Sequence, residues 1–565
     1  MRIATGGFTG RVLGLGVVAA ALLAPPAAVR ADDKSPSAKF HEDKLVGFRF
    51  RPLSDWAAVP PGTDPNDPKI GGYYSDAAKY DRTIKPELEI YAFKVQREEV
   101  ATEGGGGEEG GKEKRPQDLT PQDARDMFRE QFGAKSTRDR VRAMMDEKYQ
   151  IAEQLYASWP EKLQKKNKSL LARKDPVEKE LKAGDGVLTL LDADCVVAIT
   201  NGEIWEFKIV AGFIQNDEYE VGVIYQIPGD QWKRYSQGVV ASLRSMEFMD
   251  GAEVADARKD LADALSGAKT DDERWLEAIK RKVGPGWAHL QTKNYLLVYD
   301  KAVKPDRVKL IAKQIEAIRL DVYEQMFPAD RPVTAISVVR VCKDRDQYGQ
   351  YGGPGGSAGY WNSAEQELVF FEDTSAKKDA LRVLNHEAFH QYIFYSVGSI
   401  SPHDWFNEGH GDYFSGHDFG GTGKFVAKPF SWRQGIIKGA MGSKSYIPLK
   451  TFVTYSHQQY YGPQIGQNYA QGWSLIWFLR RTKNPAWQGI LEKYFNTLKS
   501  EVTKWVDEQI AEQKKSGEYK EGWKPAFTPD DVEENARKKA LDAAFGSFDD
   551  KTWQRFEKEW LDFKY

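Results

Sequence analysis

The chain is poor in cysteine, in histidine and in net charge, and each shortage narrows what it can be. Two cysteines in 565 residues, Cys195 and Cys342, cannot form a framework of disulfide bonds, so hydrophobic burial must hold the fold together. The 80 Lys and Arg residues nearly balance the 83 Asp and Glu residues, which excludes a polybasic nucleic-acid binder and a wholly disordered acidic chain. This length predicts roughly two to four globular domains.

No segment is apolar over the length that a bilayer demands. Near the N-terminus, arginines precede the apolar run from Val12 to Ala24, which is shorter than the roughly 20 residues of a membrane-spanning helix. Small residues at Val29 and Ala31 are typical of a signal-peptide cleavage site. We therefore expect a signal peptide over residues 1–31, cleaved after Ala31, and a secreted or periplasmic protein with no stable membrane insertion. An uncleaved interfacial anchor is the alternative.

Composition divides the remaining chain into four segments. Strand-like alternation and helical spacing over 40–250 predict an α+β domain, with a flexible insert over 103–118 that consists almost entirely of Gly, Glu, Lys and Pro. The order of strands and helix in this domain loosely resembles the PsbP-like sandwiches of exported proteins. Charged, Ala-rich residues 251–284 predict a helical connector. A second region over 285–500 mixes strands and helices, and 501–565 reads as helical, so the fold class is α+β.

Histidine is scarce, yet five of the eight histidines lie between residues 386 and 417. An even distribution would place roughly 0.45 histidines in a window of this size. The cluster contains His386-Glu387-Ala388-Phe389-His390, an H-E-x-x-H sequence on a segment with helical spacing. Chance matches to H-[DE]-x-x-H number roughly 0.02 for this composition, which favours a functional reason for the cluster.

The spacing of these residues suits a zinc centre. On a helix, His386 and His390 lie on one face and can both reach a single zinc ion, each at about 2.0 to 2.1 Å. Glu387 is placed beside them to act as a general base on zinc-activated water. A catalytic zinc ion needs a third protein ligand, for which we expect Glu408 on the next helical segment. Asp412, four residues later on the same face, can accept the second ring N–H of His386.

These positions resemble those of the gluzincin metallopeptidases, the group that includes thermolysin, aminopeptidase N and exported peptidase-MA-like proteins. The matching residues are His386, Glu387 and His390 in the first helix, and Asn407, Glu408 and Asp412 in the second. The resemblance covers the region 285–500 and implies a zincin catalytic domain. It also implies one zinc ion per chain held by His386, His390 and Glu408, with Glu387 as the general base and Asp412 supporting a ligand.

The second of these helical segments contains two glycines. Gly409 and Gly411 each weaken a helix by about 1 kcal/mol relative to Ala, which disfavours a rigid helix that starts early in this segment.

The sequence assigns no role to the other histidines of the cluster, His403, His410 and His417. A metzincin site is excluded, because it needs Gly and His where this chain has Ile393 and Ser396.

A tyrosine is expected to complete the site. Asn468-Tyr469-Ala470-Gln471-Gly472 is similar to the Tyr-x-x-Gly of aminopeptidase-N-like enzymes, which implies that the Tyr469 hydroxyl stabilises the oxyanion of the tetrahedral intermediate. Tyr460, Tyr461 and His457 lie on the same polar, aromatic loop and compete for that role. Gly359–Trp361 and Leu368–Phe371 are candidates for the sheet edge along which an extended peptide pairs.

The sequence therefore predicts an exported zinc metallopeptidase that acts on peptides or proteins. A non-catalytic cell-envelope binding or scaffold protein that keeps the zincin fold is the alternative, and a zinc hydrolase of non-peptide amides or esters is a third reading. We expect two buried thiols at Cys195 and Cys342, although a bridge between them is possible.

Overall fold

The structure is a computed structural model that describes residues 34–75, 84–95, 129, 133–183, 186–198, 203–249, 251–363, 365–372, 379–416, 418–419, 425–517, 519, 525 and 528–565. The expected signal peptide and the insert at 103–118 lie outside these residues. The described residues form an N-terminal unit over 34–287 and a C-terminal unit over 288–565. The architecture is α+β, with sheets followed by a helical C-terminal part. No helix among the described residues combines the length and apolarity needed to cross a membrane.

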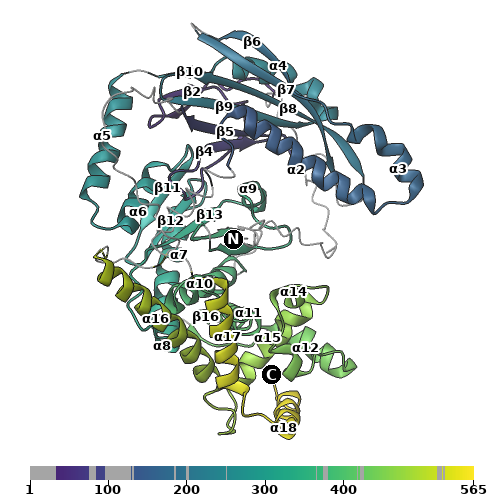
Figure 1. The fold of residues 1–565 in the computed structure, drawn as a ribbon, viewed down its shortest axis with the longest axis vertical. Helices are drawn as coiled ribbons and strands as arrows, with labels where there is room; N and C mark the ends of the chain where they lie inside the picture. The colour runs from purple at the N-terminus through teal and green to yellow at the C-terminus, as the bar shows by residue number, and fades with distance from the viewer. Residues whose placement is uncertain are drawn as a thin grey trace. The chain divides into compact units, whose positions relative to one another are not determined.

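The N-terminal unit is built on a seven-stranded antiparallel sheet with the order β3-β4-β5-β9-β8-β7-β6 (Figure 1). Its strands are β3 (Ala57–Val59), β4 (Lys69–Tyr74), β5 (Glu87–Lys94), β6 (Val177–Ala183), β7 (Gly186–Ala198), β8 (Ile204–Gln215) and β9 (Tyr219–Pro228). A small sheet contains β1 (His41–Asp43), β2 (Phe48–Phe50) and β10 (Glu247–Phe248). The helices are α2 (Thr137–Ala157), α3 (Glu161–Asn167), α4 (Trp232–Leu243), α5 (Ala252–Gly267) and α6 (Asp271–Arg281), with 3-10 turns η2 (Lys168–Leu171) and η3 (Gly229–Gln231).

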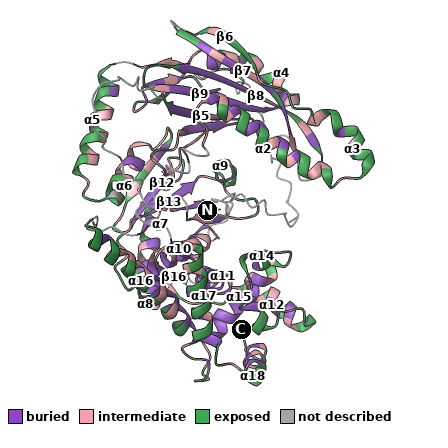
Figure 2. Cartoon of the chain, in the orientation of Figure 1, coloured by how far each residue is buried: buried purple, intermediate pink, exposed green. Residues whose placement is uncertain are grey.

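The large sheet has a hydrophobic core on each face. Successive side chains of a strand point to opposite faces, so β9 gives Val223 and Tyr225 to one core and Ile224 to the other. Helix α4 covers the first face with Val239 and Leu243, and α2 covers the second. Figure 2 shows the resulting pattern, with buried strands between helices that are exposed on their outer sides.

Two elements of this unit differ from the sequence expectation. Helical spacing predicts one helix from Val141 to Leu163, but α2 ends at Ala157 and α3 starts anew at Glu161. Pro160 explains the break, because a proline disfavours the helical conformation in the residue before it. Strand β6 was not predicted, since its side chains are mostly charged and exposed; it lies at the sheet edge, where charged residues discourage pairing with other chains.

The C-terminal unit contains a five-stranded sheet with the order β11-β12-β13-β15-β14. Its strands are β11 (Trp287–Gln291), β12 (Tyr295–Asp300), β13 (Ser337–Cys342), β14 (Gly359–Asn362) and β15 (Glu367–Phe371). β12, β13 and β15 run parallel, whereas β14 pairs antiparallel with β15 and forms one edge. A two-stranded sheet joins β16 (Asp418–Phe419) and β17 (Phe425–Val426). Of the two segments predicted to form the sheet edge, Gly359–Trp361 lies in the edge strand β14. Leu368–Phe371 lies in β15, which is interior because it pairs with both β13 and β14, so that part of the prediction is wrong.

Helices make up the rest of this unit. They are α7 (Pro305–Ile318), the π-helical turn η4 (Arg319–Tyr323), α8 (Glu324–Met326), α9 (Arg345–Tyr351), α10 (Asp379–Val397), α11 (Asp404–Ser415), α12 (Ser431–Ser443), α13 (Leu449–Phe452), α14 (His457–Tyr460), α15 (Ile465–Leu479), α16 (Ile490–Ser516), α17 (Asp530–Phe545) and α18 (Asp550–Leu561). One continuous hydrophobic core joins the sheet to helices as distant in sequence as α10, α15 and α18. Within that core, α10 packs against α11.

Both cysteines are buried and free, which confirms the expectation of two thiols. Cys195 lies on β7 of the N-terminal unit and Cys342 on β13 of the C-terminal unit. Burial raises the pKa of Cys195 to about 11 and raises that of Cys342 further. A thiol with a raised pKa is a poor nucleophile, so neither residue is a candidate for covalent chemistry.

Candidate metal centre

Helices α10 and α11 bring two imidazoles and a carboxylate together. His386 and His390 lie one turn apart on α10, and Glu408 comes from α11. Nε2 of His386 is 3.0 Å from Oε2 of Glu408, and Nε2 of His390 is 3.4 Å from the same oxygen. The three side chains are only 12%, 8% and 7% exposed. Within the described part of the chain, they form a group whose ligand atoms all lie within 4.8 Å of one another.

These distances fit a shared metal ion. Two ligands bound to zinc at about 2.0 to 2.1 Å in tetrahedral geometry are separated by roughly 3.3 Å, close to the separations seen here. The chemistry of the donors agrees. Nδ1 of His390 faces Oδ1 of Asn407 at 3.0 Å, and Nδ1 of His386 faces Oδ1 of Asp412 at 3.4 Å. Because these oxygens accept, each Nδ1 can be the donor on its ring. Each Nε2 then faces Glu408, where it donates to the carboxylate when protonated and offers a lone pair to a cation when deprotonated. Two such nitrogens beside a carboxylate oxygen make a place for a cation.

The two glycines of α11 allow this close packing. A Cβ on Gly411 would lie 2.7 to 2.8 Å from ring atoms of His386, so the missing side chain makes room for the imidazole. A Cβ on Gly409 would lie 2.7 Å from the carbonyl oxygen of Gly472, so this glycine lets α11 approach α15. The sequence indicated that both glycines weaken the helix. The structure shows that α11 forms from Asp404 to Ser415 around them, since tertiary packing outweighs their low helix propensity.

Glu387 lies between the candidate ligands and the sheet edge. The backbone amide of Trp361 on β14 lies close enough to the Glu387 carboxylate to act toward lowering its pKa. A Cβ on Gly359 would come within 3.2 Å of Cγ of Glu387, so a glycine in β14 lets the strand approach α10. Burial raises the pKa of Glu387, while the nearby charges of His386 and His390 act against that rise. The residue therefore combines a basic carboxylate with a position beside an edge strand.

The tyrosines of the following loop and helix divide into two groups. The Tyr469 ring stacks on His386 with centroids 6.3 Å apart, and its hydroxyl lies 3.5 Å from that of Tyr461. Tyr461 in turn donates a hydrogen bond to Oε1 of Glu408. Tyr460 is buried and bonds to the Asn468 carbonyl, and His457 faces Asp404. Of the four candidates, Tyr469 and Tyr461 are therefore the ones that contact the histidine and glutamate group.

The charges within this group perturb one another strongly. Burial lowers the pKa of His386, but hydrogen bonds to Asp412 and Glu408 outweigh it and raise the pKa well above its usual value. For His390 the charge of Glu408 likewise overcomes burial and raises the pKa. Burial by itself raises the pKa of Glu408, yet the charge of His390 and the hydrogen bonds from both imidazoles bring it well below its usual value. The pocket thus stabilises positive charge next to an ionised carboxylate.

The other histidines of the cluster serve packing. His403 contacts the Tyr494 hydroxyl through Nδ1 at 2.8 Å. His410 is fully buried, donates from Nδ1 to the Phe406 carbonyl and accepts from Arg480 at Nε2. Desolvation lowers the pKa of both imidazoles, to about 4 for His403. Neither reaches the ligand group, and His417 lies outside the described residues.

Sequence reasoning did not find two contacts of the site. The bond from Tyr461 to Glu408 has no local signal in the sequence. The position of Arg433 on α12 has none either. Its Nε lies 2.6 Å from Oδ2 of Asp412, and its guanidinium lies over the Tyr469 ring at 4.7 Å. Both contacts join segments that are distant in sequence, so periodicity and spacing cannot reveal them.

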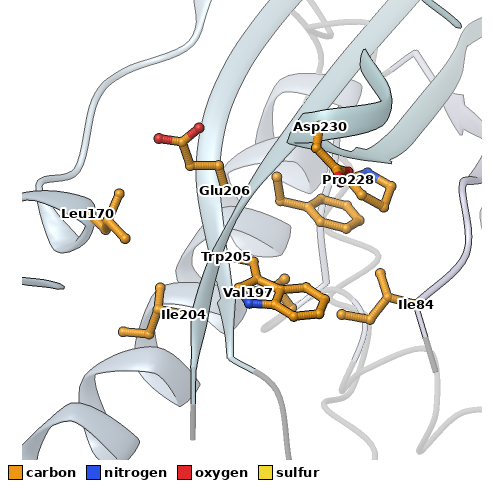
Figure 3. A pocket seen from close by; sticks show the side chains of 9 residues that line it. Ile84, Leu170, Val197, Ile204, Trp205, Glu206, Pro228 and Asp230 are labelled. Atoms are coloured by element: carbon orange, nitrogen blue, oxygen red, sulfur yellow. The ribbon is translucent and has the colours of Figure 1, made fainter. Parts of the chain in front are cut away.

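A separate pocket in the N-terminal unit has a different character. Its volume is about 270 Å³, and apolar side chains such as Trp205 and Val197, from paired strands β8 and β7, dominate its lining (Figure 3). The two ionisable lining residues are Glu206 and Asp230. This lining lacks histidine and cysteine, unlike the group on α10 and α11.

Comparisons with known proteins do not identify a family for this chain. No family model and no curated protein matches the chain. A solved structure from Bacteroides thetaiotaomicron VPI-5482 is similar over 45% of this chain and 82% of its own, with 11% identity and a TM-score of 0.17. A likeness at that level carries no argument about function.

Proposed function

We propose that this protein is an exported zinc metallopeptidase of the gluzincin type. The observation that carries the proposal is the convergence of His386, His390 and Glu408, with Glu387 next to them on α10. Two imidazoles and one carboxylate are the protein ligand set of thermolysin-like catalytic zinc sites. The alignment of both Nδ1 atoms by Asn407 and Asp412 supports the same conclusion, since ligating histidines are commonly oriented in this way.

When bound, a zinc ion would polarise a carbonyl group and lower the pKa of water in the site. The chain supplies the remaining groups. Glu387 accepts a proton from water at one of its carboxylate oxygens and passes it to the amine of the leaving peptide. Burial favours this role, because a carboxylate with a raised pKa is a better proton acceptor. Tyr469, whose ring stacks on His386, is our candidate for donating a hydrogen bond to the oxyanion.

The edge strand β14 gives the proposal a substrate position. β14 pairs with β15 on one side only, and the Trp361 amide on this strand also contacts Glu387. An extended peptide can add to such an edge through main-chain hydrogen bonds. A peptide or protein is therefore the substrate class we favour.

The test combines metal content with hydrolysis. We expect one zinc ion per purified chain, and cleavage of a fluorogenic peptide library that a chelator abolishes and zinc restores. Glu387→Gln keeps the zinc but loses the cleavage by at least 100-fold, because removing a general base costs about that much. Glu512→Gln, an exposed residue on α16, makes the same chemical change away from the site and should leave both properties intact.

Other outcomes point elsewhere. One zinc ion per chain with no hydrolysis by either form favours a scaffold protein. Hydrolysis of non-peptide amides or esters alone favours the third reading. A wild-type protein that binds no zinc contradicts the proposal.

Export is the second part of the proposal. It rests on the apolar run before Ala31 and on small residues at the expected cleavage site. The intact mass of the protein recovered from the cell envelope or medium should correspond to a chain that begins at Asp32. A mass that retains the first 31 residues would favour the uncleaved anchor.

A further inference from the structure

Arg433 occupies a position that its own helix does not explain. On α12, only Arg433, Ile437 and Ala440 are buried. Burying a guanidinium is costly unless it is paired and hydrogen-bonded, so its partners show what the burial serves. Those partners belong to α11 and α15, the helices that carry Asp412 and Tyr469.

The first contact is a two-point ion pair. Nε of Arg433 lies 2.6 Å from Oδ2 of Asp412, and Nη2 donates to Oδ1 at 3.3 Å. Oδ1 is also the oxygen that faces Nδ1 of His386 at 3.4 Å. One hydrogen bond and one close charge contact between the same two groups restrict the orientation of the carboxylate. Arg433 therefore sets the angle from which Asp412 reaches the imidazole.

The second contact is with the tyrosine. The Arg433 guanidinium carbon lies 4.7 Å from the centre of the Tyr469 ring, and Trp432 lies against the same guanidinium at 4.3 Å. The Tyr469 ring stacks in turn on His386. A planar guanidinium can stack on the face of an aromatic ring and so restrain the position of the ring. An ammonium group, which is not planar, does this less well. Arg433 thus contacts the support of a metal ligand and the candidate oxyanion donor at the same time.

We propose that Arg433 is a positioning residue that couples His386, through Asp412, to the placement of the Tyr469 hydroxyl. This inference rests on the proposed function and deepens it, because neither the H-E-x-x-H sequence nor the resemblance assigns a role to α12. Arg433 acts through its two neighbours. It also places a cation next to the Asp412 carboxylate.

Lysine and methionine substitutions of Arg433 separate the two contacts. Arg433→Lys keeps a cation for Asp412 but loses the planar group over Tyr469, whereas Arg433→Met loses both. Lys438→Met removes one positive charge from an exposed position of the same helix and is the matched control. Three quantities are measured for each protein: the zinc dissociation constant by chelator competition, kcat and KM on a fluorogenic peptide, and the thermal midpoint.

Arg433→Met should weaken zinc binding by about 10- to 100-fold, which is the usual effect of disturbing the hydrogen-bond partner that orients a metal ligand. Arg433→Lys should hold zinc within about threefold of wild type, while kcat falls about tenfold with little change in KM, since the donor is displaced. In a Tyr469→Phe background, Arg433→Lys should cost no further kcat. Lys438→Met should behave as wild type throughout.

Two results would overturn the inference. One is unchanged zinc affinity in Arg433→Met. The other is a kcat loss from Arg433→Lys that persists in full without the Tyr469 hydroxyl, as a general loss of folding would produce. A wild-type protein that binds zinc but cleaves no peptide contradicts the proposed function, and the zinc affinities of the two Arg433 variants then decide this inference. A wild-type protein without zinc affinity contradicts both.

Discussion

The hydroxyl of Tyr461 donates a hydrogen bond to Oε1 of Glu408, whereas Oε2 of the same carboxylate faces both imidazoles. The two oxygens of one side chain are therefore engaged differently. Tyr461 holds Glu408 so that a single oxygen points into the site. A carboxylate held in this way would bind a metal ion through one atom and leave room for water and substrate.

We expect Tyr461→Phe to weaken zinc binding by about 10- to 100-fold, because an outer partner of a ligand is lost. Tyr460→Phe is the control: the neighbouring hydroxyl is buried but bonds to the Asn468 carbonyl instead. Its loss should lower the free energy of unfolding by about 1 kcal/mol and leave zinc affinity unchanged. Chelator competition and chemical denaturation measure the two quantities. Equal zinc affinities in the two variants would count against the role of Tyr461.

Gly411→Ala tests the space behind His386. The added Cβ would lie 2.7 to 2.8 Å from the ring, so the imidazole must move and zinc affinity should fall at least tenfold. Gly439→Ala is made in α12, where the new Cβ meets no atom within 4 Å. Better helix propensity should stabilise that variant by about 0.5 to 1 kcal/mol with unchanged zinc binding. Wild-type zinc affinity in Gly411→Ala would show that His386 does not need this space.

His41 should make the N-terminal unit sensitive to acid. Its ring is buried between Phe50 and Tyr73, and desolvation lowers its pKa to about 4. The unfolded chain binds a proton here below about pH 6.5, but the folded chain does so only near pH 4, so stability is complete above pH 6.5 and falls as the pH drops. The loss amounts to about 3 kcal/mol.

Hydrogen–deuterium exchange of peptides covering β1 and β2 measures this effect at pH 7.5 and 4.5, after correction for the intrinsic pH dependence of exchange. His41→Gln cannot titrate, so its protection should change less between the two conditions. Identical pH responses in wild type and variant would exclude His41 as the source.

The ion pair between Arg340 and Glu367 stabilises the sheet that carries the edge strand. Each residue is 2% exposed, and Nε of Arg340 lies 2.6 Å from Oε1 of Glu367. Tyr351 donates to the other carboxylate oxygen. Glu367→Gln leaves a buried arginine without its counterion and should lower the free energy of unfolding by about 3 to 5 kcal/mol.

The double variant Arg340→Met/Glu367→Leu provides the control, because it removes both charges from the same place. It should be more stable than Glu367→Gln alone, since no unpaired charge remains buried. Chemical denaturation of the three proteins makes the comparison. If the double variant has a free energy of unfolding no higher than that of Glu367→Gln, then the attraction within the ion pair stabilises the fold by more than the burial of its two charges costs.

The local sequence predicts a good part of this fold. Alternation and turn residues predict strands over 187–199, 219–227 and 367–371, within one residue of the bounds of β7, β9 and β15, because apolar side chains at every second position specify a buried face. Helical spacing predicts a helix over 232–243, which matches α4. By contrast, β6 has no apolar pattern, since an exposed edge strand needs none.

For the candidate site, the sequence by itself determined which residues stand one helical turn apart. The four-residue spacing of His386 and His390 sets them on one face, and that of Glu408 and Asp412 does the same on the next helix. Only the tertiary structure decided that these faces meet, that Gly411 leaves room for an imidazole, and that Tyr461 and Arg433 complete the surroundings. The physical reason is that helical periodicity specifies which side of a helix is buried, whereas the partner it meets depends on the packing of the whole core.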